Sequence, residues 1–183
     1  MGKAIAAINM TLDGFCDHTV GIVDEELHQH YSALLRSAGT ILYGRITYQL
    51  MEYWPPIVKN PTGNRSIDEF AVIMDAFPKV VFSRTLKKTG WESARIATRS
   101  IEEEIAVLKQ QSDKDILIGS PSLIVAATEL NLVDQYQLCV HPIIAGKGLP
   151  LFKNISDKKL LKLIKTKMFG SGVIVLYYEP IKK

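Results

Sequence analysis

Short apolar runs alternate with helix-like segments over the first two thirds of the chain. Runs with the length of buried strands occur at residues 3–9, 41–43, 79–83 and 115–118. The segments between them repeat apolar residues at helical spacing. Later strand-like runs, with no long helix between them, are residues 133–140, 160–168 and 173–179. This order predicts an α/β fold whose mostly parallel sheet gains antiparallel strands late in the chain.

Polar residues and glycines mark where the predicted helices begin and end. Asp24 has the side chain of an N-cap, and Gly39 is predicted to end the helix that follows. Ser120 is predicted to cap a later helix, with Pro121 at its first position.

Two capping-box sequences predict further helices at residues 66–77 and 100–111. The segment before the first of them, residues 54–65, contains three prolines and a glycine. It is therefore predicted to be a long loop, and loops of this length often serve as functional lids.

Three predicted strand ends carry small or basic residues. These junctions are Gly44-Arg45-Ile46-Thr47, Ser83-Arg84-Thr85 and Gly119-Ser120-Pro121-Ser122. Ligands of open α/β sheets bind outside the carboxyl ends of the strands, so we expect the three junctions to line one site. Helix N-termini at the first and third would bind pyrophosphate, and the second would hold a further phosphate. The sequence thus predicts a nucleotide cofactor, with ordinary helix capping as the alternative at each junction.

Three residues are candidates for the substrate side of such a site. Asp13 and His28 are predicted to orient a substrate or relay a proton, and Asp13 and Trp54 are predicted to contact it. Each has a structural alternative. Asp13 begins an Asp-Gly turn pair, His28 fits a packed histidine beside an apolar stripe, and Trp54 fits a packing tryptophan.

Charge is unevenly distributed along the chain. Residues 153–183 hold eight lysines and two acidic residues, a net charge of +6, whereas the whole chain carries +3. The segment contains no arginine and few aromatic residues, so a solvated strand face is favoured over a nucleic-acid surface. Cys16 and Cys139 are too few and too far apart for a disulfide framework, and they predict free thiols in the cytoplasm.

Several other function classes lack their sequence signals. No apolar run approaches a membrane span, and no set of histidines or cysteines has metal-ligand spacing. The chain has no Walker A motif, no Gly-x-Ser-x-Gly elbow and no Gly-x-Gly-x-x-Gly after its first strand. A lone Gly-x-Gly at residues 146–148 is equally well explained as a loop that needs positive φ. These absences suit hydride transfer, in which a cofactor carries the chemistry.

Five motifs, in order and over nearly the whole chain, resemble the dihydrofolate-reductase-like superfamily. The resemblance is closest to the branch containing the reductase domain of riboflavin biosynthesis, the C-terminal domain of the deaminase/reductase. The motifs occupy residues 10–14, 42–48, 80–86, 116–120 and 142–152. The resemblance implies a single domain over residues 1–183, with a three-layer α/β/α architecture and a central mixed sheet. It also implies a homodimer, with the strand-rich C-terminal third as a natural interface.

The same resemblance implies NADPH as the cofactor, lying across the strand ends. The cofactor contacts that it implies are Gly44, Arg45, Thr47, Ser83, Arg84, Thr85, Gly119, Ser120, Ser122 and Leu123, bordered by Gly146 and Gly148. Asp13 would face the substrate. The chain departs from true dihydrofolate reductases at one position, because the family's spacing from Gly44 reaches His28 where those enzymes have an acid.

The sequence therefore predicts an NADPH-dependent reductase acting on the C=N or C=O carbon of a small heterocyclic substrate. It would be similar to the 5-amino-6-(5-phosphoribosylamino)uracil reductase of riboflavin biosynthesis. One alternative is a catalytically silent nucleotide-binding module that serves as a sensor or scaffold. A true dihydrofolate reductase is a weaker alternative, because the acid of the first helix is missing. No nucleic-acid or membrane partner and no metal are expected.

Overall fold

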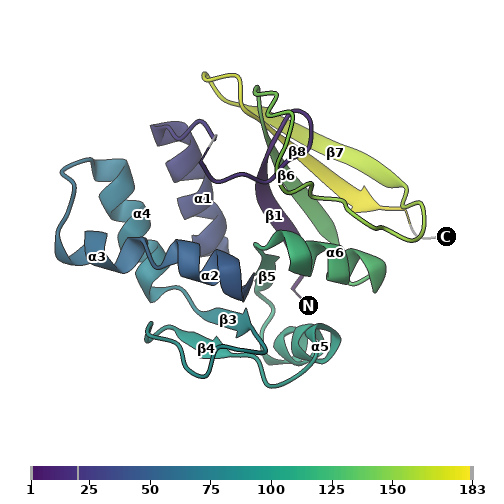
Figure 1. The fold of residues 1–183 in the computed structure, drawn as a ribbon, viewed down its shortest axis with the longest axis horizontal. Helices are drawn as coiled ribbons and strands as arrows, with labels where there is room; N and C mark the ends of the chain where they lie inside the picture. Colours follow the sequence, from purple (N-terminus) through teal and green to yellow (C-terminus); the bar gives the residue numbers. More distant parts are fainter. Residues whose placement is uncertain (1, 20, 182–183) are drawn as a thin grey trace.

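The computed structural model describes residues 2–19 and 21–181, and their strands form one eight-stranded sheet in the order β4-β3-β2-β5-β1-β6-β8-β7 (Figure 1). The strands are β1 (Ala4–Thr11), β2 (Ala38–Gly44), β3 (Lys79–Phe82), β4 (Ala94–Ile96), β5 (Asp115–Ile118), β6 (Gln135–His141), β7 (Leu161–Met168) and β8 (Ile174–Pro180). The first six in the spatial order pair in parallel, and β8 and β7 pair antiparallel at the end. The predicted mixed sheet with antiparallel C-terminal strands is confirmed.

Helices cover both faces of the sheet (Figure 1). They are α1 (Glu25–Ser37), α2 (Arg45–Met51), α3 (Trp54–Lys59), α4 (Arg65–Ala76), α5 (Ile101–Gln111) and α6 (Pro121–Glu129). One face buries Leu35 of α1 and Phe70 of α4 in a core cluster, and the other buries Ile105 of α5 and Ile124 of α6. The architecture is the three-layer α/β/α arrangement that the family resemblance implies.

Two helix boundaries differ from the sequence prediction. Gly39 does not end α1, because the helix stops at Ser37 and Gly39 already lies in β2. The predicted capping box at residues 66–69 is wrong as well. The side chain of Asn64 accepts hydrogen bonds from the N–H groups of Ser66 and Ile67, so α4 begins earlier. The predicted N-cap Asp24 and the capping box at Ser100 are both confirmed.

Two short elements were missed. Residues 54–59 form α3 rather than part of a long loop, because Pro55 and Pro56 occupy its first turn, where no intrahelical N–H partner is needed. The strand β4 has only three residues, and it pairs with β3 through Lys79 and Ala94. A run this short carries too little periodicity to be recognised along the chain.

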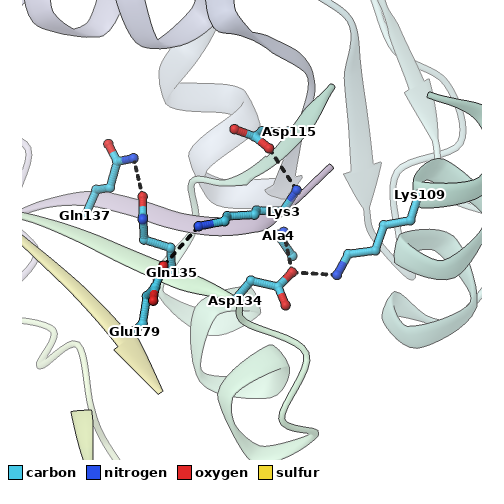
Figure 2. A network of polar contacts seen from close by, with 8 residues as sticks. All are labelled: Lys3, Ala4, Lys109, Asp115, Asp134, Gln135, Gln137 and Glu179. Atoms are coloured by element: carbon cyan, nitrogen blue, oxygen red, sulfur yellow. Dashed lines mark hydrogen bonds and ion pairs between the residues drawn. The ribbon is translucent and has the colours of Figure 1, made fainter. Parts of the chain in front are cut away.

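The amino ends of the parallel strands are closed by polar contacts (Figure 2). The backbone N–H of Lys3 donates to Asp115 at 2.8 Å, and the Lys3 ammonium donates to Glu179 at 2.9 Å. Asp134 accepts from the N–H of Ala4 at 2.8 Å and from Lys109 at 2.5 Å. These groups join the starts of β1, β5 and β6 to β8 and α5.

Lys79, the first residue of β3, is buried at the same end of the sheet. Its ammonium donates to the carbonyl oxygens of Met74 at 2.5 Å and Phe77 at 2.6 Å, and to the hydroxyl of Ser93 at 2.9 Å. It also lies 3.8 Å from the ring centroid of Trp91. Burial lowers the pKa of Lys79 to about 7. This lysine satisfies carbonyls at the end of α4 and links that helix to the segment before β4.

Candidate functional site

The three small-residue junctions lie at one edge of the sheet. They follow β3, β2 and β5, which are neighbours and run parallel, so their carboxyl ends meet at the same edge. The N–H of Gly44 donates to the hydroxyl of Ser120 at 2.8 Å, which joins the first junction to the third. A Cβ atom at Gly44 would lie 3.3 Å from the Ser122 hydroxyl. Phe82 is the register partner of Gly44, so the second junction begins at the level where the first one begins.

Helix capping differs between the two helices that begin at these junctions and three of the other four, and the short α3 also lacks a side-chain cap. The side chains of Asp24, Asn64 and Ser100 cap α1, α4 and α5. The starts of α2 and α6 receive no side-chain cap. Ser120 occupies the N-cap position of α6 as predicted, but its buried hydroxyl serves Gly44 instead. The N–H groups of the first turn of α6 therefore remain available to a ligand.

Two arginines stand at this edge without acidic partners. Arg45 and Arg84 are exposed, and no ion pair involves either one within residues 2–19 and 21–181. Arg45 donates to the Gln49 side chain at 3.0 Å, one turn further along α2. The Ser83 hydroxyl accepts a hydrogen bond from the N–H of Thr85 at 3.2 Å. The turn that carries Arg84 is therefore held by the side chain of Ser83. Thr47 is half-buried on α2.

Three glycines near the edge have structural explanations. At Gly119 a Cβ atom would lie 2.7 Å from the ring of Tyr43, so packing against β2 requires glycine there. Gly146 and Gly148 have φ values of 72° and 139°, which L side chains rarely adopt. The alternative of a loop that needs positive φ therefore accounts for residues 146–148 without a ligand. Leu123 is half-buried in the first turn of α6.

Asp13 ties two loops together at the same edge. Its carboxylate accepts hydrogen bonds from the Thr11 hydroxyl at 2.6 Å, the Ala145 N–H at 3.1 Å and the Gly146 N–H at 2.7 Å. The hydrogen bond from Thr11, followed by the one from Gly146, lowers the pKa of Asp13 to about 2. The side chain is exposed and ionised near neutral pH. It can orient a neighbouring group, but it holds no proton to donate.

His28 and Trp54 contact each other inside an aromatic cluster. The His28 ring is 6.2 Å from the Trp54 ring and 5.7 Å from the Phe70 ring, measured between centroids. His28 is buried on α1, and this burial lowers its pKa. The cluster joins α1, α3 and α4, so both residues have the packing environment that their structural alternatives describe.

One polar group near the carboxyl edge escaped the sequence analysis. Asn9 accepts a hydrogen bond from the hydroxyl of Tyr31 at 2.9 Å, and its carbonyl oxygen lies 3.2 Å from Nε2 of His141. The signal was present, because Asn9 interrupts an apolar strand and His141 follows another. The sequence could not show that β1 and β6 pair and bring the two side chains together.

The parts of the chain that the structure describes carry neither a metal-ligand cluster nor a membrane-spanning helix. No cluster of three or more histidine, cysteine, aspartate or glutamate side chains there could hold a metal ion. No described helix is both long and apolar enough to cross a membrane. Cys16 and Cys139 are free, and burial raises the pKa of their thiols to about 11 and about 12.

Comparison with known proteins places these features in a wider group. The sequence model of the RibD C-terminal domain family matches residues 3–175. The uncharacterized protein YyaP of Bacillus subtilis is 33% identical over 181 residues, which cover 97% of this chain and 94% of YyaP. A putative riboflavin biosynthesis protein from Shewanella has a similar structure, with a TM-score of 0.76 and 19% identity over 98% of this chain and 99% of that one.

A second solved structure combines two activities in one chain. It is the diaminohydroxyphosphoribosylaminopyrimidine deaminase/5-amino-6-(5-phosphoribosylamino)uracil reductase of Thermotoga maritima, with a TM-score of 0.67 and 17% identity. The match covers 98% of this chain and 57% of that protein. At these identities the two structures establish a shared fold.

Proposed function

The chain belongs to the RibD C-terminal domain family, and we propose that it is an NADPH-dependent reductase. It would transfer hydride to a C=N or C=O carbon of a small heterocyclic substrate. The Thermotoga protein, whose name gives 5-amino-6-(5-phosphoribosylamino)uracil as the compound reduced, offers a chemical precedent. We do not propose folate reduction. The acids nearest to His28 in the sequence have other partners, since Glu25 accepts from Gln29 and Glu26 accepts from Gly170. Asp24, the acid that interacts electrostatically with His28, caps α1.

The observation that carries this proposal is the uncapped start of α6 beside Gly44. Ser120 gives its hydroxyl to Gly44, so the N–H groups of Ser122 and Leu123 have no side-chain cap. A helix N-terminus combines such N–H groups with a partial positive charge, and the two together favour a phosphate. Gly44 keeps a Cβ atom out of the space beside Ser122. The residues at this edge fit a pyrophosphate.

The arginines fit the remaining charges of NADPH. Arg45 at the start of α2 would add to the pyrophosphate contacts, together with Thr47. Arg84, supported by Ser83 and Thr85, would contact the 2′-phosphate, because an unpaired guanidinium can bind a phosphate through two hydrogen bonds. Bound NADPH would supply the hydride. The protein's part is to bind, orient and exclude water.

Asp13 would position the substrate side of the site. Its ionised carboxylate holds the loop after β1 against the loop after β6, through the N–H groups of Ala145 and Gly146. With a pKa of about 2, it cannot act as a general acid near neutral pH. This property also favours a second candidate function. A nucleotide-binding module without turnover would need the cofactor contacts and no proton donor.

Titration with NADPH and NADH, followed by thermal unfolding, tests the proposal. A ligand that binds only the native state must raise the unfolding temperature. We expect a larger rise with NADPH than with NADH, and no rise with either would refute cofactor binding. Oxidation of NADPH in the presence of pterins, flavin precursors and simple carbonyl compounds then separates the two candidates. Binding without turnover across that panel would favour the silent module.

We also propose that the protein self-associates through one face of β7. Leu163 and Met168 remain 48% and 74% exposed on the same face, beside the half-buried Leu176 of β8. Lys165 and Lys167 point to the opposite face, so the exposed apolar face carries no charge from them. A second copy of the chain would cover it.

Changing Leu163 and Met168 together to glutamate should convert a dimer into a monomer in sedimentation equilibrium. Lys165→Glu, on the other face, serves as the control and should leave the mass unchanged. A wild-type protein that is already monomeric would refute this interface.

A further inference from the structure

Asn9 lies where β1 extends beyond its neighbour β5. The last register pair between these strands is Ala6 with Ile118, and β1 then continues to Thr11 with only β6 beside it. At about 3.3 Å per residue, Asn9 lies roughly 10 Å beyond the end of β5. No strand pairs with this edge of β1 at the level of Asn9, and Asn9 is exposed.

The hydrogen bonds around His141 fix the orientation of the Asn9 amide. The backbone N–H of Ile22 donates to Nδ1 of His141 at 2.9 Å, so Nδ1 must be unprotonated. In the neutral ring the proton then resides on Nε2, which faces Asn9 at 3.2 Å. Asn9 must turn its carbonyl oxygen toward this N–H. The opposite orientation would set two donors against each other.

Tyr31 of α1 also requires the carbonyl oxygen of Asn9 to face it. Its hydroxyl donates to the Asn9 carbonyl oxygen at 2.9 Å, and burial raises the Tyr31 pKa well above its ordinary value, so the donor stays protonated. Burial lowers the pKa of His141, which keeps its ring neutral. With the carbonyl oxygen taken by two donors, the Asn9 amide nitrogen is directed away from them. No group in the described part of the chain accepts a hydrogen bond from it.

We propose that the Asn9 amide nitrogen is a hydrogen-bond donor that selects the substrate, with Tyr31 and His141 as the residues that position it. The inference rests on the proposed reductase function. It restricts the substrate class to heterocycles with a carbonyl oxygen at the ring position that faces the Asn9 amide nitrogen. A ring with an amino group in the same place would set one donor against another and leave both unpaired.

A matched pair of probes tests this selection in the NADPH-loaded protein. Uracil carries carbonyl oxygens at the two ring positions where 2,4-diaminopyrimidine carries amino groups. The wild-type protein should bind uracil more tightly when both probes are neutral. Asn9→Asp keeps the acceptor for Tyr31 and His141 but removes the outward donor. We expect the affinity ratio of uracil to 2,4-diaminopyrimidine to fall by about tenfold or more.

Two further variants separate selection from a structural role. His141→Gln can still accept from Ile22 and donate to Asn9, so it should retain the wild-type ratio. His141→Leu can do neither, and its ratio should move toward one. Met10→Leu changes the adjacent residue of β1, which packs on the other face of the sheet, and should leave the ratio unchanged. NMR titration of His141 gives a readout without a probe, because the new carboxylate in Asn9→Asp should raise the His141 pKa.

The outcomes distinguish this inference from the reductase proposal. An equal ratio in wild type and Asn9→Asp would overturn the role of Asn9. So would a failure of both probes to bind at millimolar concentration while NADPH still raises the unfolding temperature. Failure of NADPH itself to bind would instead refute the reductase proposal.

Discussion

Charged side chains have protein partners at the amino ends of the parallel strands, whereas two arginines at the carboxyl ends have no acidic partner among the described residues. At the amino ends, Lys3 donates to Glu179 and Asp134 pairs with Lys109 (Figure 2). Lys79, at the same end, donates to backbone carbonyl oxygens. A hollow of about 350 Å³ opens beside Lys79, yet the ammonium there is already occupied by carbonyls. At the carboxyl ends, Arg45 and Arg84 are exposed and have no acidic partner among the described residues.

Under the proposed function, this difference marks where the chain would give up stability for binding. An N-cap side chain contributes about 1 kcal/mol, and α6 forgoes that contribution because Ser120 bonds to Gly44. The capped helix α5 begins at the same edge with a complete capping box at Ser100. Helix starts at this edge can therefore be capped, and the one next to Gly44 is left open. Departures of this kind from local rules are expected at functional sites.

Lys79→Met should give the largest effect, and it should be confined to stability. The variant keeps the apolar stem but leaves the carbonyls of Met74 and Phe77 without their donor. We expect the free energy of unfolding to fall by about 2–4 kcal/mol in urea denaturation. Lys114→Met, which removes an exposed charge nearby, is the control. A measurable loss of NADPH affinity in Lys79→Met would break the contrast between the two ends.

Arg84→Ala should have the opposite profile. Without the guanidinium, NADPH binding should weaken by about 1.5–3 kcal/mol in calorimetric titration, the range for a charged hydrogen bond, with little change for NADH. Unfolding stability should stay within about 0.5 kcal/mol of wild type, because Arg84 is exposed. Equal losses of affinity for NADPH and NADH would show that Arg84 does not bind the 2′-phosphate. As the control, Lys114→Ala removes one positive charge at the amino ends of the strands and should leave the affinities for NADPH and NADH unchanged.

Ser120→Ala and Ser100→Ala compare two serines at helix starts. Each should cost about 1 kcal/mol of unfolding free energy, the first through the Gly44 N–H and the second through the cap of α5. Ser120→Ala alone should also weaken NADPH binding, by about threefold to tenfold, because Gly44 loses its attachment to α6. An equal loss of NADPH affinity in both variants would show that binding follows overall stability and does not depend on the contact between Ser120 and Gly44.

The last expected effect is a pH dependence of stability that arises from Lys79. Its pKa is lowered to about 7 in the folded protein and is about 10.4 in the unfolded chain, so the unfolded state binds more protons between these values. Stability should therefore rise as pH increases from 7 to 9. Lys79→Met should lack this rise, and the difference between the two proteins cancels all other titrating groups. A parallel pH profile for the two proteins would count against a depressed pKa.

Local signals predicted the elements, and the non-sequential strand order limited the prediction of the site. Asp24 and Ser100 were identified as caps because capping depends on residues within one turn. The same proximity rule failed at Ser120, whose partner Gly44 is 76 positions away. The three junctions could be grouped because parallel strands end at a common edge. The contacts of Asn9 and His141 could not be inferred, because they depend on the pairing of β1 with β6.

The position of β5 also constrains the order in which the protein can be built. The sheet places β5 between β1 and β2, although it is synthesised after both. Until residue 120 has left the ribosome, the chain contains Gly44 and Arg45 but lacks the hydroxyl that holds Gly44 and the helix start beside it. A nascent chain or a fragment that ends before β5 cannot assemble the candidate site. A cofactor that needs both junctions can therefore stabilise the sheet only after β5 and the start of α6 have been added, and it cannot guide the folding that precedes them.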